Sequence, residues 1–484
     1  MYIGLDLGTS GVKALLIDDA QKIVGSANAP LEVSRPHSGW SEQNPQDWLD
    51  ATAEALSELK KSHPAEMGKV SGIGLSGQMH GATLLDASDK PLRPCILWND
   101  TRSHVEAAAL DADPKFRKLT GNIVFPGFTA PKLAWVKSNE PDIFAATRKV
   151  LLPKDYLRLW LTGEHVSEMS DAAGTAWLDV EKRRWDASLL AATALDESHM
   201  PRLVEGTEVS GSLRRELCER FGFDNAPVVA GGAGDNAASA CGAGTVAPGS
   251  AFLSLGTSGV LFAANEAYLP NPESAVHTFC HALPGTWHQM GVILSATDSL
   301  NWLSGITGRS AGELTAALGE NLKAPGRATF VPYLSGERTP HNDAAIRGGF
   351  CGLSHQDDAA ALTQAVLEGV AFAFRDNLEA LKAAGTTLTR ATAIGGGSRS
   401  RYWLKAIATA LQIELDIPAE GDFGAAFGAA RLGLIAANGG DALSVCQPPV
   451  ITETIEPDEA LTDAFENAYL RYRALYPALR GVEQ

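Results

Sequence analysis

The residues best suited to chemistry lie in and beside two copies of one turn, Gly-Thr-Ser-Gly. The first copy is within LDLGTSGV at residues 5–12, and the second is within LSLGTSGV at residues 253–260. Glycine permits backbone angles at which successive N–H groups point into one concavity, and the two hydroxyl groups add further donors. A single copy would be more typical of an ordinary hairpin, but the repetition favours a phosphate-binding role for both turns.

Charged side chains border only the first copy. Asp6 stands where the second copy has Ser254, and Lys13 stands where it has Leu261. A carboxylate at this position could hold Mg²⁺ through water, and an ammonium group could meet phosphate charge. These differences predict that the first turn faces the reacting, metal-bound end of a polyphosphate, whereas the second holds the polyphosphate passively.

A third candidate is Asp235, in the segment VVAGGAGDNAASA. An apolar strand predicted at 227–230 leads through glycines to this carboxylate, which could accept a proton from a substrate hydroxyl during phosphoryl transfer. Aspartate is also a preferred helix N-cap, and NAASACGAG could be the helix that it caps. The local sequence leaves both roles open, and one carboxylate could serve in both.

Two further segments are rich in glycine. The three glycines of 395–397 join a predicted strand to a predicted helix, where a base or ribose could approach the backbone closely. Residues 72–77 match G-x-G-x-x-G, but the following sequence predicts strand and turn rather than the helix of a dinucleotide-binding motif. The chain contains no G-x-x-x-x-G-K-[ST] motif, so phosphate is not held by a P-loop.

These candidates need elements that hold them in place. Residues 2–8, 12–17 and 22–31 are β-prone runs separated by tight turns, which predicts an antiparallel meander. Residues 47–62 carry apolar side chains along one helical face, and a strand-like run follows at 70–77. The pattern predicts a sheet with helices packed against it.

The second half of the chain begins in the same way. Residues 251–265 predict two strands about the second turn, and helical patterns follow at 358–382 and 398–415. VAPGS at 246–250 is the candidate boundary, because proline and glycine interrupt periodic structure. We expect two related halves with a cleft between them, although an eight-residue repeat could also arise from two unrelated hairpins.

The composition is that of a large globular protein. Among 484 residues, 45% are apolar and 20% are charged, and this length suggests two or three domains. The net charge of -17 would repel nucleic acid and anionic membrane surfaces, so neither is an expected partner. A nucleotide could still bind through backbone N–H groups and a cation.

Cysteine usage and the N-terminal sequence suggest a compartment. The six cysteines are scattered without a C-x-x-C pair and are expected to be buried, reduced thiols. The sequence begins MYIGLDLGTSG, without a signal-peptide pattern, and contains no apolar run long enough to span a membrane. The expected location is the cytoplasm.

Taken in order, these motifs resemble the FGGY family of carbohydrate kinases over nearly the whole chain. The matching segments include LDLGTSGVKALLID, GLSGQMHGATLLD, RPCILWNDTR, LLPKDYLRLWLTGE, VVAGGAGDNAA, SLGTSGV, PYLSGERTPHND and IGGGSRSRYW. The resemblance implies an α/β fold of two ribonuclease-H-like domains of the actin-like ATPase type, enclosing the ligands in an interdomain cleft. Residues 1–246 would form the sugar and Mg²⁺ side, and residues 247–484 the nucleotide side.

The resemblance also implies an activity, the ATP-dependent phosphorylation of D-xylulose to D-xylulose 5-phosphate in pentose catabolism. The QMHG and GDN segments favour this ketose over glycerol as the acceptor. Another ketose, a polyol or a sugar acid remains an alternative substrate. An actin-like ATPase that is not a sugar kinase is a more distant alternative, and it would need a peptide-binding or polymerising surface.

Residue roles follow from the same resemblance, which makes Asp235 the general base and suggests a homodimer. The residues expected around the metal and sugar are Asp6 for Mg²⁺, and Met79, His80, Asp235 and Asn236 for the sugar. The residues expected around ATP are Thr9, Ser10 and Lys13 at the transferred phosphoryl, Thr257 and Ser258 at the other phosphates, and Gly396, Gly397 and Ser400 at the adenosine.

Two details depart from or complicate the family pattern. The segment GGAGDN stands where a shorter GGGDN is expected, which could alter the loop before Asp235. Arg399 and Arg401 flank Ser400 and could contact the nucleotide in its place.

Overall fold

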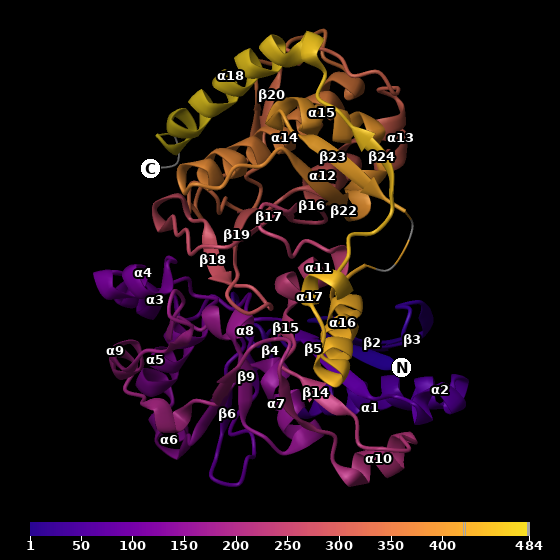
Figure 1. Cartoon of the computed structure of the whole chain (residues 1–484). Helices are drawn as coiled ribbons and strands as arrows, with labels where there is room; N and C mark the ends of the chain where they lie inside the picture. Colours follow the sequence, from indigo (N-terminus) through magenta and orange to yellow (C-terminus); the bar gives the residue numbers. More distant parts are fainter. Residues whose placement is uncertain (420, 422, 482–484) are drawn as a thin grey trace.

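Two lobes, each built around a seven-stranded mixed sheet, make up the computed structural model (Figure 1). The structure describes residues 1–419, 421 and 423–481.

The first sheet has the strand order β13-β14-β5-β1-β2-β3, with the short β15 also paired to β5. Strands β1, β2 and β3 form the predicted antiparallel meander. On the other side of β1, strands β5 and β14 run parallel to it. The strands are β1 (Tyr2–Leu7), β2 (Gly11–Ile17), β3 (Ile23–Pro30), β5 (Gly72–Gly77), β13 (Val209–Ser212), β14 (Val228–Ala230) and β15 (Ala233–Gly234).

The second sheet repeats this plan in the order β18-β19-β17-β16-β22-β23-β24. A run of antiparallel strands again starts at a central strand, β16, although here β17 pairs with β19 and β18 lies at the edge. Two parallel strands again lie on the other side of β16, followed by an antiparallel edge strand. The strands are β16 (Ala251–Leu255), β17 (Gly259–Asn265), β18 (His277–Cys280), β19 (Trp287–Ile293), β22 (Arg390–Ile394), β23 (Glu414–Pro418) and β24 (Ile451–Ile455). The matching topology confirms that the two turns belong to related halves.

Helices and short strands complete the lobes. The longer helical elements are α1 (Pro45–Ser62), α3 (His104–Asp111), α4 (Pro114–Thr120), α5 (Thr129–Asn139), α7 (Pro153–Thr162), α10 (Arg215–Phe221), α11 (Asp235–Ala243), α12 (Thr297–Thr307), α14 (Ala359–Ala383), α15 (Arg401–Leu411), α16 (Ala425–Asn438) and α18 (Thr462–Arg480). The shorter ones are α2 (Pro64–Gly68), α6 (Pro141–Ala146), α8 (Met169–Ala173), α9 (Ala187–Ala192), α13 (Ala311–Ala316), α17 (Ala442–Val445), η1 (Glu197–His199), η2 (Pro272–Ser274), η3 (Gly396–Arg399) and η4 (Glu459–Leu461). The remaining strands are β4 (Glu42–Gln43), β6 (Thr83–Leu85), β7 (Cys95–Ile96), β8 (Lys149–Leu151), β9 (Val166–Glu168), β10 (Leu178–Asp179), β11 (Arg184–Trp185), β12 (Arg202–Val204), β20 (Thr329–Val331) and β21 (Gly349–Cys351).

The predicted helix in the first half is confirmed as α1, and its sequence explains both its start and its buried face. The side chain of Asn44 caps it by accepting a hydrogen bond from the Gln46 N–H, and Pro45 takes the first helical position. Trp48 and Leu56 are fully buried on the side that faces β2 and β3. Burial of this apolar face holds the meander that carries the first turn.

Helix α16 comes from the second half of the chain but packs on the first sheet. Figure 1 shows it, in yellow, within the lobe otherwise coloured indigo to magenta. It lies so close to the strands that a Cβ atom on Gly74 would be 1.7 Å from the Ala429 carbonyl oxygen, and one on Gly4 would be 1.8 Å from that of Ala426. Only glycine allows this approach. The division at residues 246 and 247 stays a prediction, with α16 lying outside the lobe of its own half.

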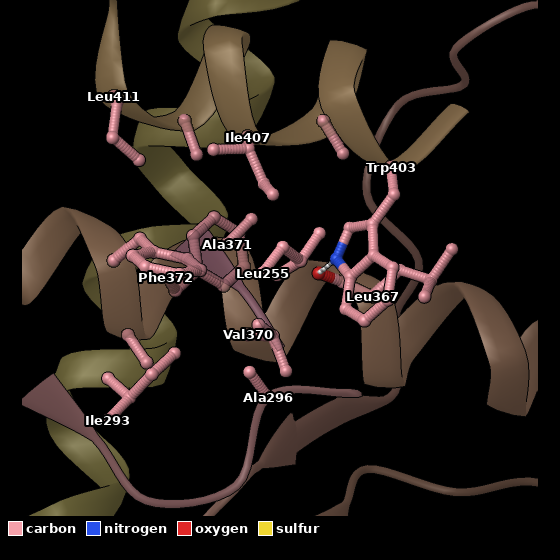
Figure 2. Packing of buried hydrophobic residues seen from close by; sticks show 14 of the residues in the cluster. Leu255, Ile293, Ala296, Leu367, Val370, Ala371, Phe372, Trp403, Ile407 and Leu411 are labelled. Atoms are coloured by element: carbon pink, nitrogen blue, oxygen red, sulfur yellow. Dashed lines mark hydrogen bonds between the residues drawn. The ribbon is translucent and has the colours of Figure 1, made fainter. Parts of the chain in front are cut away.

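The core of the second lobe anchors the strand that leads into the second turn. Leu255, at the end of β16, packs among side chains of α14 and α15 (Figure 2). The Trp403 indole N–H donates to the Leu367 carbonyl oxygen at 3.0 Å and so joins these two helices. The second turn and the start of α15 are therefore held by one packed cluster.

The structure tests two expectations from the sequence, that the cysteines are buried and that no segment spans a membrane. All six cysteines are free, and five are buried, but Cys351 is exposed, so the expectation of burial was wrong at that residue. Its strand, β21, pairs with β20 in a two-stranded sheet near the surface. Across the described part of the chain, no helix combines the length and apolar character that spanning a membrane requires.

Candidate active site

The carboxyl ends of three strands of the first sheet bring two acidic residues together. Asp6 on β1 is in register with Ser76 on β5, and the Ser76 hydroxyl donates to Asp6 Oδ1 at 2.9 Å. Ala233 of β15 pairs with Ser76 from the other side, and Asp235 follows two residues later. Because parallel strands end at the same edge, Asp6 and Asp235 face one region although they are far apart in sequence.

Asp235 is the first residue of α11, and Gly234 is the N-cap. The alternative that Asp235 caps this helix was therefore wrong. In the first turn, only the neighbouring Asn236 donates a hydrogen bond to the Asp235 side chain. Its Oδ1 atom accepts hydrogen bonds from the Asn236 backbone N–H at 2.7 Å and from the Asn236 amide at 2.9 Å. Asn236 thus fixes one carboxylate oxygen and leaves Oδ2 as the atom for a substrate.

The surroundings of Asp235 make it a stronger base than an ordinary aspartate. Its side chain is half-buried by accessible surface, but the protein packed around it raises its pKa to about 6. The nearby charge of Asp6 also raises this pKa, and the hydrogen bonds from Asn236 oppose the rise. A carboxylate of this kind is ionised at neutral pH and still accepts a proton readily.

Met79 lies beside the residue that precedes Asp235, and His80 is the next residue in the chain. A Cβ atom on Gly234 would be 2.9 Å from Met79 Cγ and Sδ, so the Met79 side chain packs directly over the residue before Asp235. His80 has a positive φ of 70° and stacks on Phe128 with ring centroids 4.7 Å apart.

The imidazole of His80 is neutral and has a defined tautomer. Burial lowers the pKa of His80 to about 3, and its Nδ1 lies 2.7 Å from the Gly174 carbonyl oxygen. A carbonyl oxygen only accepts, so Nδ1 carries the proton and Nε2 is left as an acceptor.

The first turn is held by a network of polar side chains. The Thr9 hydroxyl donates to Gln78 Oε1 at 3.1 Å and accepts from the Trp98 indole N–H at 3.0 Å. The Gln43 amide donates to the Thr9 carbonyl oxygen at 2.7 Å. Lys13 stands opposite Asp6 in the β1–β2 ladder. Beside the turn is a cavity of about 380 Å³, which is lined by Ser10, Gly11, Val12, Lys13, Asn28, Ala29 and Pro30.

The residues predicted for the rest of the nucleotide gather at one end of the second sheet. Thr257 and Ser258 are exposed at the tip of the β16–β17 hairpin, and the Thr257 carbonyl oxygen accepts from the Ala296 N–H at 2.8 Å. Strand β22 runs parallel to β16, so η3, which contains Gly396 and Gly397, begins beside this hairpin.

Ser400 has a structural task at the same place, because its hydroxyl caps α15 by accepting from the Trp403 N–H at 3.3 Å. Of its two neighbours, Arg401 forms an ion pair with Glu453 at 2.6 Å. That contact gives Arg401 a structural partner and leaves Arg399, which is exposed, as the arginine available to a nucleotide.

Sequence reasoning assigned no role to Arg338 and its aromatic neighbours, which bring the second half of the chain against Phe125 and His80 of the first. Arg338 lies over the Phe125 ring at 4.0 Å from its centroid, and one of its nitrogens is 3.3 Å from His277 Nε2. Phe279 lies 6.2 Å from the His80 ring. The only signal for Arg338 was its place in the SGERTPHND segment.

Comparisons with known proteins agree with this architecture. The models of the FGGY family of carbohydrate kinases match residues 1–242 with the N-terminal domain and residues 251–437 with the C-terminal domain. A xylulose kinase of Escherichia coli (strain K12) is 49% identical over 482 residues, covering 99% of each chain.

Solved structures are similar over the same length. The crystal structure of a "xyloylose kinase" from Brucella ovis has 68% identity and a TM-score of 0.98, covering 99% of both chains. A gluconate kinase from Lactobacillus acidophilus, with 24% identity and a TM-score of 0.93 over 99% of this chain and 97% of its own, shares the fold. The predicted α/β fold of two ribonuclease-H-like units of the actin-like ATPase type is confirmed.

Proposed function

Because the chain belongs to the FGGY family of carbohydrate kinases, we propose that it transfers the γ-phosphoryl group of ATP to the terminal hydroxyl of D-xylulose. The products would be D-xylulose 5-phosphate and ADP. The full-length likeness to a xylulose kinase supports the choice of sugar. The observation that carries the proposal is the meeting of Asp6 and Asp235 at one edge of the first sheet, with Met79 packed over Gly234.

Asp235 would be the general base. Its Oδ2 atom would take the proton from the sugar hydroxyl while that oxygen forms a bond to the γ-phosphorus, and the bond to the β,γ-bridging oxygen would break, releasing ADP. The raised pKa of Asp235, about 6, suits this proton transfer. Closure of the two halves over the ligands would exclude water, which otherwise competes with the sugar as acceptor.

Met79, His80 and Asn236 would orient the sugar. Since the Gly174 carbonyl fixes the tautomer of His80, its Nε2 atom would accept a hydrogen bond from a sugar hydroxyl. The stacked Phe128 ring limits rotation of the imidazole. Such a preset acceptor favours a sugar with a hydroxyl at the matching carbon and rejects one without it.

Asp6 fits a role as the residue that holds Mg²⁺. Magnesium is usually bound through one or two carboxylates together with water and substrate phosphates, rather than by a cage of protein ligands. Asp6 offers such a carboxylate beside Asp235, and the described residues contain no group of three or more His, Cys, Asp or Glu side chains that could hold a metal. The ion would spread the negative charge that develops on the phosphate oxygens.

The two turns would hold the nucleotide from two sides. Because the Thr9 hydroxyl already has protein partners, Thr9 would offer its backbone N–H to the transferred phosphoryl group, together with Ser10 and Lys13. Thr257 and Ser258 would hold the other phosphates, exposed as they are at the hairpin tip. Gly396, Gly397 and Ser400 would adjoin the adenosine.

Several finer points remain predictions from the sequence. Another ketose, a polyol or a sugar acid is the alternative substrate, and the gluconate kinase shares only the fold at its level of identity. The division into residues 1–246 and 247–484, the homodimer and the cytoplasmic location are also predictions.

The proposal is tested by assaying ADP release with D-xylulose, D-ribulose, glycerol and gluconate. We expect the highest kcat/KM with D-xylulose. Asp235→Asn should lower kcat by about 10²- to 10⁴-fold while D-xylulose binding, measured by calorimetry, is retained. A different preferred sugar would refute the substrate, and wild-type turnover by the variant would refute the base.

A matched control is Asp113→Asn. Asp113 is a partly exposed aspartate that caps α4, and asparagine caps a helix equally well. This variant should keep wild-type kcat, which separates loss of the reacting carboxylate from the general effect of an Asp-to-Asn change.

A further inference from the structure

A cluster of charged side chains lies beneath the loop that carries Asp235. It comes from α7, β9 and α8, and we call it the α7–α8 charge cluster. Its members, none of which exposes side-chain surface, are Lys154, Asp155, Arg158, Glu168 and Asp171. Lys154 Nζ lies 2.9 Å from an Asp155 oxygen, 3.5 Å from a Glu168 oxygen and 3.4 Å from an Asp171 oxygen.

Glu168 of this cluster is connected to Gly234, the residue before Asp235, by hydrogen bonds through Ser170. The Gly234 backbone N–H donates to Ser170 Oγ at 3.0 Å, inside the protein. The Ser170 hydroxyl in turn donates to Glu168, with its oxygens 2.9 and 3.1 Å away. Because Glu168 takes the hydroxyl proton, a lone pair of Ser170 is directed at Gly234.

Glu168 is itself fixed. It caps α8 by accepting from the backbone N–H groups of Ser170 at 2.7 Å and Asp171 at 2.9 Å, and it lies beside the Lys154 ammonium group. Its orientation, and hence that of the Ser170 hydroxyl, is set by three partners.

Arg158 of the cluster binds the start of the segment that leads from β14 to Asp235. Its guanidinium donates to the carbonyl oxygens of Ala230 at 2.6 Å and Gly231 at 2.5 Å, where β14 ends. A third bond goes to Ser210 Oγ at 2.5 Å. The segment from residue 230 to residue 234 is thus held at its start by Arg158 and at its end by Ser170.

Burial of this many charges is a poor way to gain stability. Removing charged groups from water costs free energy that their mutual attraction repays only in part, and apolar residues of similar volume often serve as well. Burial raises the pKa of Asp171 well above its usual range, and neither of its oxygens has a hydrogen-bond partner. The remaining benefit of the cluster is its geometry.

We propose that Ser170, oriented by Glu168 and Lys154, is a positioning residue that fixes the peptide of Gly234 and thereby aims the Asp235 carboxylate at the sugar hydroxyl. This inference rests on the proposed role of Asp235 as the base. Ser170 touches no reacting atom in this account. Its loss would let the peptide rotate, and a displacement of about 1 Å at a reacting group can cost about 100-fold in rate.

The chain supplies a matched control in Ser167. It is also fully buried, it lies on β9 three residues before Ser170, and its hydroxyl has no hydrogen-bond partner. Ser167→Ala and Ser170→Ala each remove one hydroxyl oxygen from the same region. Only Ser170→Ala removes the acceptor of the Gly234 N–H.

The experiment compares kcat and KM for D-xylulose and ATP in the full-length wild type and in Ser170→Ala, Ser170→Cys and Ser167→Ala. Cysteine preserves the volume of serine but accepts a hydrogen bond only weakly, so it also guards against a packing defect in the alanine variant. Both Ser170 variants should lose about 10- to 100-fold in kcat, with KM for each substrate changed less than roughly twofold. Ser167→Ala should match the wild type.

Amide hydrogen exchange gives a second readout, independent of turnover. The Gly234 N–H should exchange faster in both Ser170 variants than in Ser167→Ala. Wild-type kcat in either Ser170 variant, or an equal loss of kcat in Ser167→Ala, would overturn the inference.

Asp235→Asn, assayed alongside, separates this inference from the proposed function. If that variant keeps wild-type kcat, the assignment of the base fails. If it loses activity while the Ser170 variants do not, only the positioning role fails.

Discussion

Asp235 shows how one carboxylate is tuned by what surrounds it. Burial and the charge of Asp6 raise its pKa, and the amide and N–H of Asn236 restrain the rise. Asn236 also binds only one of its oxygens, so the neighbour that orients the carboxylate is also the one that limits the rise in its pKa. The carboxylate is the active form of a general base, so its protonation should switch the enzyme off.

This environment predicts a pH profile. With the pKa of Asp235 at about 6, kcat/KM for the sugar should fall about tenfold per pH unit below pH 6, because the protonated acid cannot accept the hydroxyl proton. Initial rates measured at saturating ATP, at pH values between roughly 4.5 and 8, would give this fall in kcat/KM. A wild-type limb near pH 4, that of an ordinary aspartate, would contradict the prediction.

At the residue scale, the sequence was informative where two copies could be compared. The contrast of Asp6 and Lys13 with Ser254 and Leu261 singled out the charged turn. For Asp235 it left two roles open, and the N-cap alternative was wrong because the cap depends on a backbone angle at Gly234 that the sequence does not reveal. It also missed the neighbours of His80, since Phe128, Gly174 and Phe279 are remote in the chain.

The packing of α16 on the first sheet depends on glycines that allow close approach. Gly74 on β5 lies against the Ala429 carbonyl, and Gly428 of α16 lies against the Ala238 carbonyl of α11, with a Cβ atom there only 1.8 Å away. Helix α11 begins with Asp235, so α16 supports the helix on which the base stands. The position of α16 is thereby linked to the catalytic carboxylate.

Gly74→Ala should therefore destabilise the protein. The new methyl group would clash with helix backbone rather than with a movable side chain, which should cost about 1–3 kcal/mol or more in the free energy of unfolding. Denaturant unfolding followed by circular dichroism would measure the change. The control is Gly305→Ala in α12, where a Cβ atom meets nothing within 4 Å. That variant should be neutral or gain about 0.5–1 kcal/mol. Equal stability of the two variants would contradict the close packing.

At the element scale, local pattern predicted the hairpins at the two turns and the helices α1, α14 and α15, because periodicity and turn residues act within a few positions. It could not predict that α16 leaves its own half, since an apolar helix rich in alanine and glycine suits either sheet. The prediction that the glycines of residues 72–77 do not form a dinucleotide-binding motif was correct. What they do became clear only from the structure, in which Gly72 and Gly74 allow α16 to pack closely on β5.

Over the whole molecule, the two lobes share a core. One buried apolar cluster combines Met79 and Phe128 of the first half with Phe252, Phe279 and Met290 of the second. Together with α16, this cluster joins the halves through apolar packing as well as through chain connectivity. Neither half buries all of its own apolar surface.

Residues 1–246 produced alone should therefore fail to fold. The fragment would lack α16 and the partners of its share of the core, and it should show no cooperative thermal transition and should bind a hydrophobic dye, unlike the full chain. Calorimetry and near-ultraviolet circular dichroism would test this. A native-like cooperative transition in the fragment would show that the first half is autonomous. Pattern analysis predicted the two-part plan, but it carried no signal of this mutual dependence.

The remote origin of α16 also has a consequence for protein synthesis. When the first sheet has been translated, the helix that covers it is still roughly 190 residues away. At ordinary elongation rates of about 5–20 residues per second, this leaves roughly 10 to 40 seconds during which the nascent chain carries a bare apolar surface. The growing polypeptide is thus exposed to aggregation late in translation, which makes it a natural client of chaperones that act at the ribosome.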